Sequence, residues 1–264
     1  MTINFHQLKY FIKNYFAAKR NGHGVHSPFA YQLCEEVFYN ASHFYDFDAL
    51  KKLRATLLNN ETEIKIEDFG AGSKTFTTNK RKISELTKKG TSTTKQSETL
   101  YKLINFLNCN TSIELGTSIG LNTLYLASAN KNGQVITIEG SKSLFEFAAT
   151  LATTNKINNI EFTHAKFDEA LPQALQKINS LDLFYIDGNH TYEATLNYFN
   201  LALTKKNNSS VFVFDDIYWS KGMTRAWEEI KKHPSVTLSI DTFYFGLAFF
   251  REEVKEKVDL KFYL

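Results

Sequence analysis

The stretch SIELGTSIGLNTLYLA, residues 112–127, predicts in immediate succession a short buried strand, a glycine turn and the start of a helix. The strand is expected to end on an acid, Glu114. Two glycines follow, Gly116 and Gly120, which let the backbone pass close under a bound group. The helix begins near Leu121, and free N–H groups in its first turn would favour a carboxylate or a phosphate. The stretch therefore indicates a site for a nucleotide-like ligand and leaves open which of these anions it holds.

Two common nucleotide-binding motifs do not fit this turn. A dinucleotide fingerprint would place glycines at positions 116, 118 and 121, where the second and third residues are Ser118 and Leu121. A P-loop would require a lysine after the turn, and the segment Leu121–Thr123 has none. Pyrophosphate binding is therefore disfavoured.

Composition points to one sizeable α/β core plus an accessory segment, because the chain has 264 residues of which 43% are hydrophobic. No apolar run approaches the ~20 residues of a membrane span, and Lys9 and Lys13 stand where a signal peptide has its apolar region. Two lone cysteines, Cys34 and Cys109, fit buried thiols in a reducing compartment. We expect a cytoplasmic protein without a membrane span. Its formal charge of +3 is too small to argue for nucleic acid.

The N-terminal part is expected to be helical. Residues 3–19 carry apolar side chains at helical spacing, which favours a helix docked on the core or in a homodimer over a membrane-surface helix with a lightly basic polar face. A second helix is expected from Pro28 to about Asn40, with Ser27 as N-cap. The His23–His26 turn offers no third metal ligand nearby, so its role stays open.

A second glycine motif, Gly70–Gly72, follows a short strand-like segment but is a weaker site, because the residues after it are polar. The basic run at 74–95 suits a solvated loop, or a lid that attracts an anionic substrate. We therefore expect an accessory or lid segment over residues 1–89 and a catalytic domain over residues 90–264. The role of the Gly70–Gly72 loop stays open.

From residue 97 onward, predicted helices and strands alternate, which indicates a parallel sheet with helices on both faces. After the strand that ends on Glu114, the remaining strands are expected at 134–139, 159–164, 181–186, 210–214, 236–240 and 243–251. The last two are joined by a turn so short that they must be antiparallel. The predicted fold is α/β, a doubly wound and mostly parallel seven-stranded sheet with an antiparallel last strand and a helical N-terminal extension.

Acids follow the strands of this predicted sheet. They are Glu114, Glu139, Asp187 and the pair Asp215 and Asp216. Ligands of open α/β sheets bind outside the carboxyl ends of the strands, so these acids are expected in one crevice. A cluster of carboxylates requires compensation, which a metal ion or a cationic ligand would supply.

Glu139 follows the glycine turn at about the 20-residue interval of an acid that hydrogen-bonds ribose hydroxyls, and we predict that role for it. Phe167 and Asp168, after the next strand, could pack on an adenine and hydrogen-bond to it. A helix cap with a buried aromatic side chain explains these two residues equally well.

The glycine turn, the ribose acid, Ile186–His190 (IDGNH), Val213–Asp216 (VFDD) and the terminal antiparallel pair together resemble the catechol O-methyltransferase-like group of class I S-adenosylmethionine-dependent methyltransferases. The resemblance covers about residues 90–251. It implies S-adenosylmethionine as cofactor and a divalent cation, with magnesium as the expected ion. The implied cofactor-binding residues are Glu114, Gly116, Thr117, Gly120, Glu139, Gly140, Phe167, Asp168 and Asp187, and the implied metal ligands are Asp187, Asp215 and Asp216.

In the catechol enzymes a lysine three residues beyond the first metal acid is the base, and the matching residue here is His190. Histidine titrates near neutral pH, so it could accept a hydroxyl proton. The predicted reaction is metal-assisted O-methylation of a small-molecule hydroxyl, with His190 and Asp187 in catalytic roles. Tyr218 and Trp219 could wall the substrate pocket, or belong to the core. Two alternatives stay open: a nucleic-acid methyltransferase that uses the basic run at 74–95, which is disfavoured, and a nucleotide-binding protein without turnover.

Overall fold

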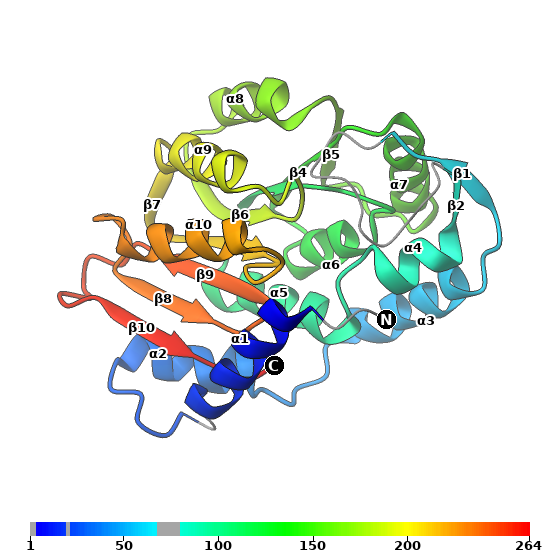
Figure 1. The fold of residues 1–264 in the computed structure, drawn as a ribbon. Coiled ribbons are helices and arrows are strands. Elements are labelled where there is room, and N and C mark those ends of the chain that lie inside the picture. The colour runs from blue at the N-terminus through cyan, green and yellow to red at the C-terminus, as the bar shows by residue number, and fades with distance from the viewer. Residues whose placement is uncertain (1–3, 20–21, 68–79) are drawn as a thin grey trace. The chain divides into compact units, whose positions relative to one another are not determined.

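The computed structural model describes residues 4–19, 22–67 and 80–264, and it divides the chain into two compact units (Figure 1). One unit combines residues 1–40 with residues 178–264, and the other is residues 41–177. The Gly70–Gly72 motif and the first part of the basic run, residues 74–79, lie outside the described residues.

Unit 41–177 contains the glycine turn and is built on three parallel strands. Strand β3 (Thr111–Leu115) pairs with β4 (Gln134–Glu139), which pairs with β5 (Ile160–His164). Helix α6 (Leu121–Ala129) connects the first two strands, α7 (Lys142–Thr154) the next two, and α8 (Phe167–Lys177) follows β5. Every residue of α6 is buried, so the helix that starts at the glycine turn is a core element.

The basic run is folded where the structure describes it. Strand β2 (Lys80–Lys82) pairs antiparallel with β1 (Glu63–Lys65), and α4 (Ile83–Lys89) packs on α3 (Tyr45–Leu58) through buried Ile83 and Leu86. The loop expected for residues 80–89 was therefore wrong, because two buried side chains anchor this segment. The predicted boundary at residue 90 falls inside this unit, between α4 and α5 (Thr94–Leu107).

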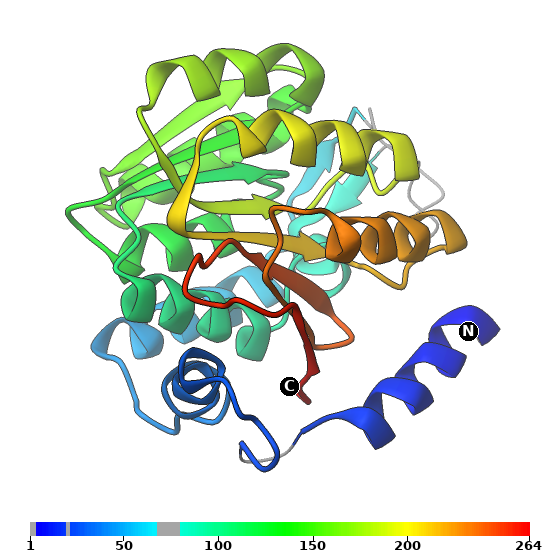
Figure 2. The same ribbon diagram turned by 90° about the vertical axis from the view of Figure 1, so that its left-hand side faces the viewer.

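The other unit carries the strand ends that hold Asp187 and Asp215. Its strands are β6 (Leu181–Ile186), β7 (Lys206–Asp215), β8 (Leu238–Asp241), β9 (Phe245–Phe249) and β10 (Val258–Lys261). Strands β6 and β7 are parallel, and β9 runs antiparallel to both β7 and β8. Helices α9 (Tyr192–Leu203) and α10 (Lys221–Lys232) pack side by side and contact these strands (Figure 2).

Two features of this unit were not predicted. Beside β3–β9, which correspond to the seven predicted strands, the described residues contain β10, which pairs parallel with β8. The helix expected over residues 28–40 is α2 (Pro28–Leu33), which continues as the π-helix η1 (Cys34–Phe38). The N-terminal helix forms as expected, as α1 (Phe5–Ala17). Among the helices that the structure describes, none has the length and apolarity needed to cross a bilayer.

Candidate functional site

The glycine turn between β3 and α6 needs glycine for two reasons. Gly116 and Gly120 have φ values of 101° and 82°, in the left-handed region that residues with a Cβ rarely adopt. A Cβ at Gly120 would also lie 2.8 Å from the Cβ of Ala148 in α7. The N–H of Gly116 donates to the carbonyl of Ile138 at 3.0 Å, which fixes the turn against β4. The turn is therefore held close to the carboxyl ends of β3 and β4.

Glu114 is fully buried, and its carboxylate faces the protein interior. One oxygen accepts from Thr123 Oγ1 and from Thr137 Oγ1, the latter at 2.7 Å, and the other accepts from Asn122 Nδ2 at 3.1 Å. Thr117, also buried, lies 2.6 Å from Thr137 through its hydroxyl. In this arrangement Glu114 joins β3, β4 and α6 below the turn, so its side chain stabilises the turn, and the cofactor contact considered for it stays a prediction.

Burial raises the pKa of Glu114 from 4.5 to about 7, against the opposing effect of its three hydrogen-bond donors. A folded-state pKa above the unfolded value means that stability is highest in acid and is lost as pH rises through about 7. Because of the titration of Glu114 alone, we expect the free energy of unfolding to fall by about 3 kcal/mol between pH 4.5 and pH 8. Glu114→Gln, which carries no charge, should reduce that fall in urea unfolding measured at both ends of the range.

Glu161 in β5 provides the matched control for this stability prediction, because its side chain is 33% exposed and pairs with Lys177. Glu161→Gln should retain the pH dependence of the parent protein. An equal pH dependence in the parent and in Glu114→Gln would show that the buried carboxyl does not titrate as stated.

Glu139 ends β4 and connects the glycine turn to the next helix. One carboxylate oxygen accepts from the N–H of Ser118 in the turn, and the other accepts from the N–H of Ser141, both at 2.9 Å. Burial raises the pKa of Glu139, while these N–H groups act in the opposite direction. Gly140 follows, and its carbonyl lies 3.0 Å from Nε2 of His164. The carboxylate is therefore held rigidly at the carboxyl end of β4, beside the glycine turn.

Phe167 and Asp168 are in the first turn of α8, after β5. Phe167 is half-buried and Asp168 is exposed. An acid in the first turn of a helix is favourable by itself because it faces the positive end of the helix dipole. The structure is thus compatible with both roles considered for this pair, and adenine binding stays a prediction.

In the other unit, the parallel register of β6 and β7 pairs Ile186 with Phe214, so Asp187 and Asp215 leave the sheet at the same edge. The phenol of Tyr185 joins them: its hydroxyl lies 2.8 Å from Asp215 Oδ2 and 3.4 Å from Asp187 Oδ2. Burial raises the pKa of Asp215 and of Asp216, and their mutual repulsion adds to the effect on Asp215. These carboxyl groups therefore take up protons more readily than ordinary aspartates.

The backbone at this edge adopts rare conformations. Asn189 has φ 48° and Asp216 has φ 53°, both in the left-handed region. Non-glycine residues in this region cluster at functional sites, where the surrounding structure holds them in place. Here the side-chain amide of Asn189 donates to the hydroxyl of Tyr198 at 3.1 Å, and the N–H of Asp216 donates to the carbonyl of Tyr244 at 3.0 Å. These two hydrogen bonds therefore hold the loop after β6 and the loop after β7 in place.

The predicted metal ligands do not form a metal centre in this structure. Over residues 4–19, 22–67 and 80–264, no three His, Cys, Asp or Glu side chains are grouped so that they could hold an ion. Asp215 is held by protein donors, because Oδ2 accepts from Tyr185 and Oδ1 accepts from the N–H of Asp216 at 2.8 Å. A divalent cation at Asp187, Asp215 and Asp216 stays a prediction.

His190 lies beside these acids with one nitrogen unused. Its Nε2 is 3.7 Å from Asp187 Oδ1, and its buried Nδ1 has no hydrogen-bond partner. Burial lowers the pKa of His190 below 6.5, and the charge of Asp215 opposes this effect. The imidazole is therefore mostly neutral at pH 7, which is the form that accepts a proton.

Tyr218 and Trp219 differ in their surroundings. Tyr218 is 2% exposed, its hydroxyl donates to Asp241, and its ring stacks on Tyr10 of α1 with centroids 4.4 Å apart. The core role considered for Tyr218 thus describes this structure, and a pocket wall does not. Trp219 is partly exposed, and its N–H donates to the carbonyl of Asp216 at 2.8 Å. A substrate contact by Trp219 stays a prediction.

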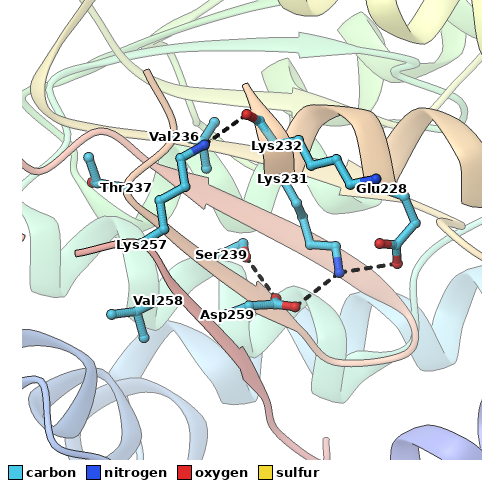
Figure 3. Close-up of a pocket in the computed structure, with 9 residues that line it drawn as sticks. All are labelled: Glu228, Lys231, Lys232, Val236, Thr237, Ser239, Lys257, Val258 and Asp259. Carbon is cyan, nitrogen blue, oxygen red and sulfur yellow. Dashed lines mark hydrogen bonds and ion pairs between the residues drawn. The ribbon is translucent and has the colours of Figure 1, made fainter. Parts of the chain in front are cut away.

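A pocket of about 330 Å³ lies among α10, β8 and β10, and none of the residues that line it is a predicted site residue (Figure 3). Its charges are paired internally: Lys231 contacts Asp259 at 3.0 Å and Glu228 at 3.1 Å. Lys257 donates to the carbonyls of Lys232 and His233 at the end of α10. These lysines serve the local structure, and the pocket is not the candidate site.

Sequence reasoning missed four residues that hold the predicted site acids in place. The role of Tyr185 could have been found in the sequence, because a hydroxyl in a buried strand must find a hydrogen-bond partner and an aspartate follows two residues later. The roles of Ser118 and Ser141 could not, because they contribute backbone N–H groups that almost any residue could supply. Thr137 resembled an ordinary β-branched strand residue.

Comparison with known proteins supports a methyltransferase. Residues 113–217 match the model of a family described as a methyltransferase domain. No curated protein matches the chain. The O-methyltransferase from Bacillus cereus, solved in complex with SAH, is 18% identical, with a TM-score of 0.54 over 81% of this chain and 94% of that one.

Two further solved structures are similar. The O-methyltransferase TomG from Streptomyces achromogenes, involved in tomaymycin synthesis and solved with SAM, is 22% identical, with a TM-score of 0.54 over 61% of this chain and 82% of that one. A SAH-bound methyltransferase from Podospora anserina is 10% identical, with a TM-score of 0.56 over 80% of this chain and 98% of that one. The predicted fold, a mostly parallel α/β sheet of the class I methyltransferase type, is confirmed, and so is the resemblance.

Proposed function

We infer that the chain is an S-adenosylmethionine (SAM)-dependent methyltransferase that methylates a hydroxyl oxygen of a small molecule. The observation that carries this inference is the carboxylate of Glu139, fixed by two N–H groups beside the glycine turn. This arrangement lies within the segment that matches the methyltransferase domain model. The fold shared with O-methyltransferases supports the choice of oxygen as the acceptor atom.

The residues of unit 41–177 fit SAM. Glu139 would accept hydrogen bonds from the ribose hydroxyls, as an acid at this place in nucleotide-binding units does. Gly116, Thr117, Gly120 and Gly140 would present backbone to the cofactor, and Phe167 with Asp168 would receive the adenine. Glu114, whose buried carboxylate accepts hydrogen bonds from three side chains, would keep the glycine turn in its conformation.

When bound, SAM supplies an electrophilic methyl group on a sulfonium, which passes to the acceptor oxygen and leaves a neutral thioether. The protein then has two tasks, to orient the acceptor and to take its proton. We assign the second task to His190, whose lowered pKa keeps a ring nitrogen free to accept the hydroxyl proton at neutral pH. Asp187, 3.7 Å from that ring, would orient the imidazole and stabilise it once protonated.

The experiment that tests this function combines binding with turnover. Calorimetry should detect one saturable SAM site per chain. Incubation with SAM carrying a tritiated methyl group, and a panel of hydroxylated aromatic and aliphatic acceptors, should transfer the label to at least one of them. Absence of SAM binding would refute the assignment. Binding without label transfer to any acceptor, RNA included, would favour a nucleotide-binding protein without turnover.

We expect methyl transfer to proceed in the presence of EDTA, because the phenol of Tyr185 satisfies the carboxylates that a cation would otherwise bridge. Tyr185→Phe should free these oxygens and raise the affinity for Mn²⁺, measured by calorimetry, and Asp215→Asn in that background should abolish the gain. Tight Mn²⁺ binding by the parent protein, together with loss of turnover in EDTA, would restore the predicted magnesium site.

We also propose a reducing, cytoplasmic setting. Its basis is Cys34, which is a buried free thiol. Burial raises the pKa of Cys34 to about 11, which keeps this thiol protonated and unreactive. The measurement is localisation of a fluorescent fusion in intact cells.

A further inference from the structure

Helix α1 exposes a ridge of large apolar side chains. Phe5 and Phe16, at its two ends, are 81% and 82% exposed, and Leu8 and Ile12 between them are 42% and 48% exposed. At 3.6 residues per turn, these four positions lie on one face, because their spacings of three, four and four residues each nearly complete a turn. Monomeric proteins rarely present such side chains in a continuous row without a function for them.

The opposite face of α1 is firmly attached. Asn14 is buried, and its amide donates to the buried carboxylate of Asp241 at 2.5 Å. The ring of Tyr10 stacks on Tyr218, and His6 Nε2 lies 2.8 Å from Thr224 Oγ1. The exposed ridge therefore belongs to a docked helix, which can be followed in dark blue in Figure 2.

Positive charge predominates at the N-terminal end of the chain, and this asymmetry favours an anionic partner for the exposed ridge of α1. The first 34 residues contain Lys9, Lys13, Lys19 and Arg20 and no acid, whereas the rest of the chain has 27 basic and 28 acidic residues. Lys9 and Lys13 are exposed in α1 and occupy the same side of the helix as the ridge. An apolar row flanked by cations matches a surface that is both apolar and anionic.

We propose that the exposed face of α1 binds the surface of an anionic lipid membrane, with the phenylalanines inserted among acyl chains and Lys9 and Lys13 at the headgroup phosphates. A second copy of the chain fits less well. A symmetric pair would bring the lysines of both copies together. One ridge on a helix about 20 Å long is also far smaller than the ~800 Å² per partner of a standard interface. RNA would leave the apolar row exposed to water.

The test is flotation of the full chain with vesicles of phosphatidylcholine mixed with phosphatidylglycerol, compared with phosphatidylcholine alone. Binding should require the anionic lipid and weaken with added salt. Phe5→Ser with Phe16→Ser should weaken it by about tenfold per side chain. Lys9→Gln with Lys13→Gln should weaken it by about fivefold per charge. All four side chains are exposed, so the fold should persist.

Matched controls come from exposed residues elsewhere. Tyr45→Ser removes an aromatic side chain that is 92% exposed in α3, and Lys52→Gln with Lys255→Gln removes two exposed charges. None of these controls should alter flotation. Calorimetry with SAM on every variant keeps the result separate from the proposed function, because α1 variants should bind SAM as the parent does.

Four outcomes would overturn the proposal. They are absence of flotation, equal flotation with phosphatidylcholine alone, flotation that survives the double phenylalanine variant, and binding of RNA in preference to vesicles. A dimer in sedimentation velocity that the phenylalanine variant dissociates would instead assign the ridge to a second copy, and would overturn it as well.

Discussion

Replacement of Glu139 by alanine is expected to weaken SAM binding about a hundredfold, the largest effect on cofactor affinity of any single substitution considered. A hydrogen bond to a charged group contributes about 1.5–3 kcal/mol, and two ribose hydroxyls on one carboxylate therefore account for about 3 kcal/mol, or two orders of magnitude in Kd. Calorimetric titration of the variant with SAM measures this loss directly.

Glu139→Ala also removes the acceptor for the N–H groups of Ser118 and Ser141, so a second variant is needed. Glu139→Gln retains one acceptor oxygen and should bind SAM with intermediate affinity. The control is Glu161 on the neighbouring strand β5, which is only half-buried, and Glu161→Ala should bind SAM normally. Parent-like affinity in both Glu139 variants, with urea unfolding unchanged, would remove this residue from the cofactor site.

The sequence was a good guide wherever a buried strand or a capped helix formed by itself. The bounds predicted for β4 and β6 are those observed. Ser27 shows why a helix start was predictable, because its side chain accepts from the N–H of Ala30, three residues later. These signals are local, so one sequence contains them.

Strands β2 and β10 escaped prediction for the opposite reason. Lys80–Lys82 is polar throughout, and it is a strand because Glu63–Lys65 pairs with it. Val258–Lys261 pairs parallel with Leu238–Asp241 at the side of β8 opposite β9. Strand formation in such short segments depends on the partner strand rather than on their own residues. Their partners lie too far along the chain to be identified from local pattern.

The candidate site also has features that local sequence predicts and features that it does not. Strand ends and glycine turns can be recognised from local sequence, and they located Glu114, Glu139, Asp187 and Asp215. The partner that each carboxylate selects depends on side chains from neighbouring strands. Thr137 of β4 donates to Glu114, and Tyr185 of β6 donates to Asp215. The sequence left a pocket wall and a core role open for Tyr218 for a similar reason, because its cover comes from Tyr10 in a distant helix.

Replacement of His190 by alanine is expected to lower kcat by about 10²–10⁴, the range associated with loss of a positioned general base. The affinity for SAM should not change, because the imidazole is assigned to the acceptor proton alone. In the parent protein the base must be neutral, and burial lowers its pKa below 6.5. The rate should therefore fall on acidification only below pH 6.5, and this acidic limb should be absent from the residual activity of the variant.

His26 is the matched control for this prediction, because it is exposed in the turn before α2 and should tolerate alanine without effect on kcat. Added imidazole should restore part of the activity of His190→Ala and none to His190→Gln, whose longer side chain fills the space. A merely structural histidine would behave differently, with rate and stability falling together and no response to imidazole. An unchanged kcat in His190→Ala would leave water as the proton acceptor, and would place the whole of catalysis in the orientation of the two substrates.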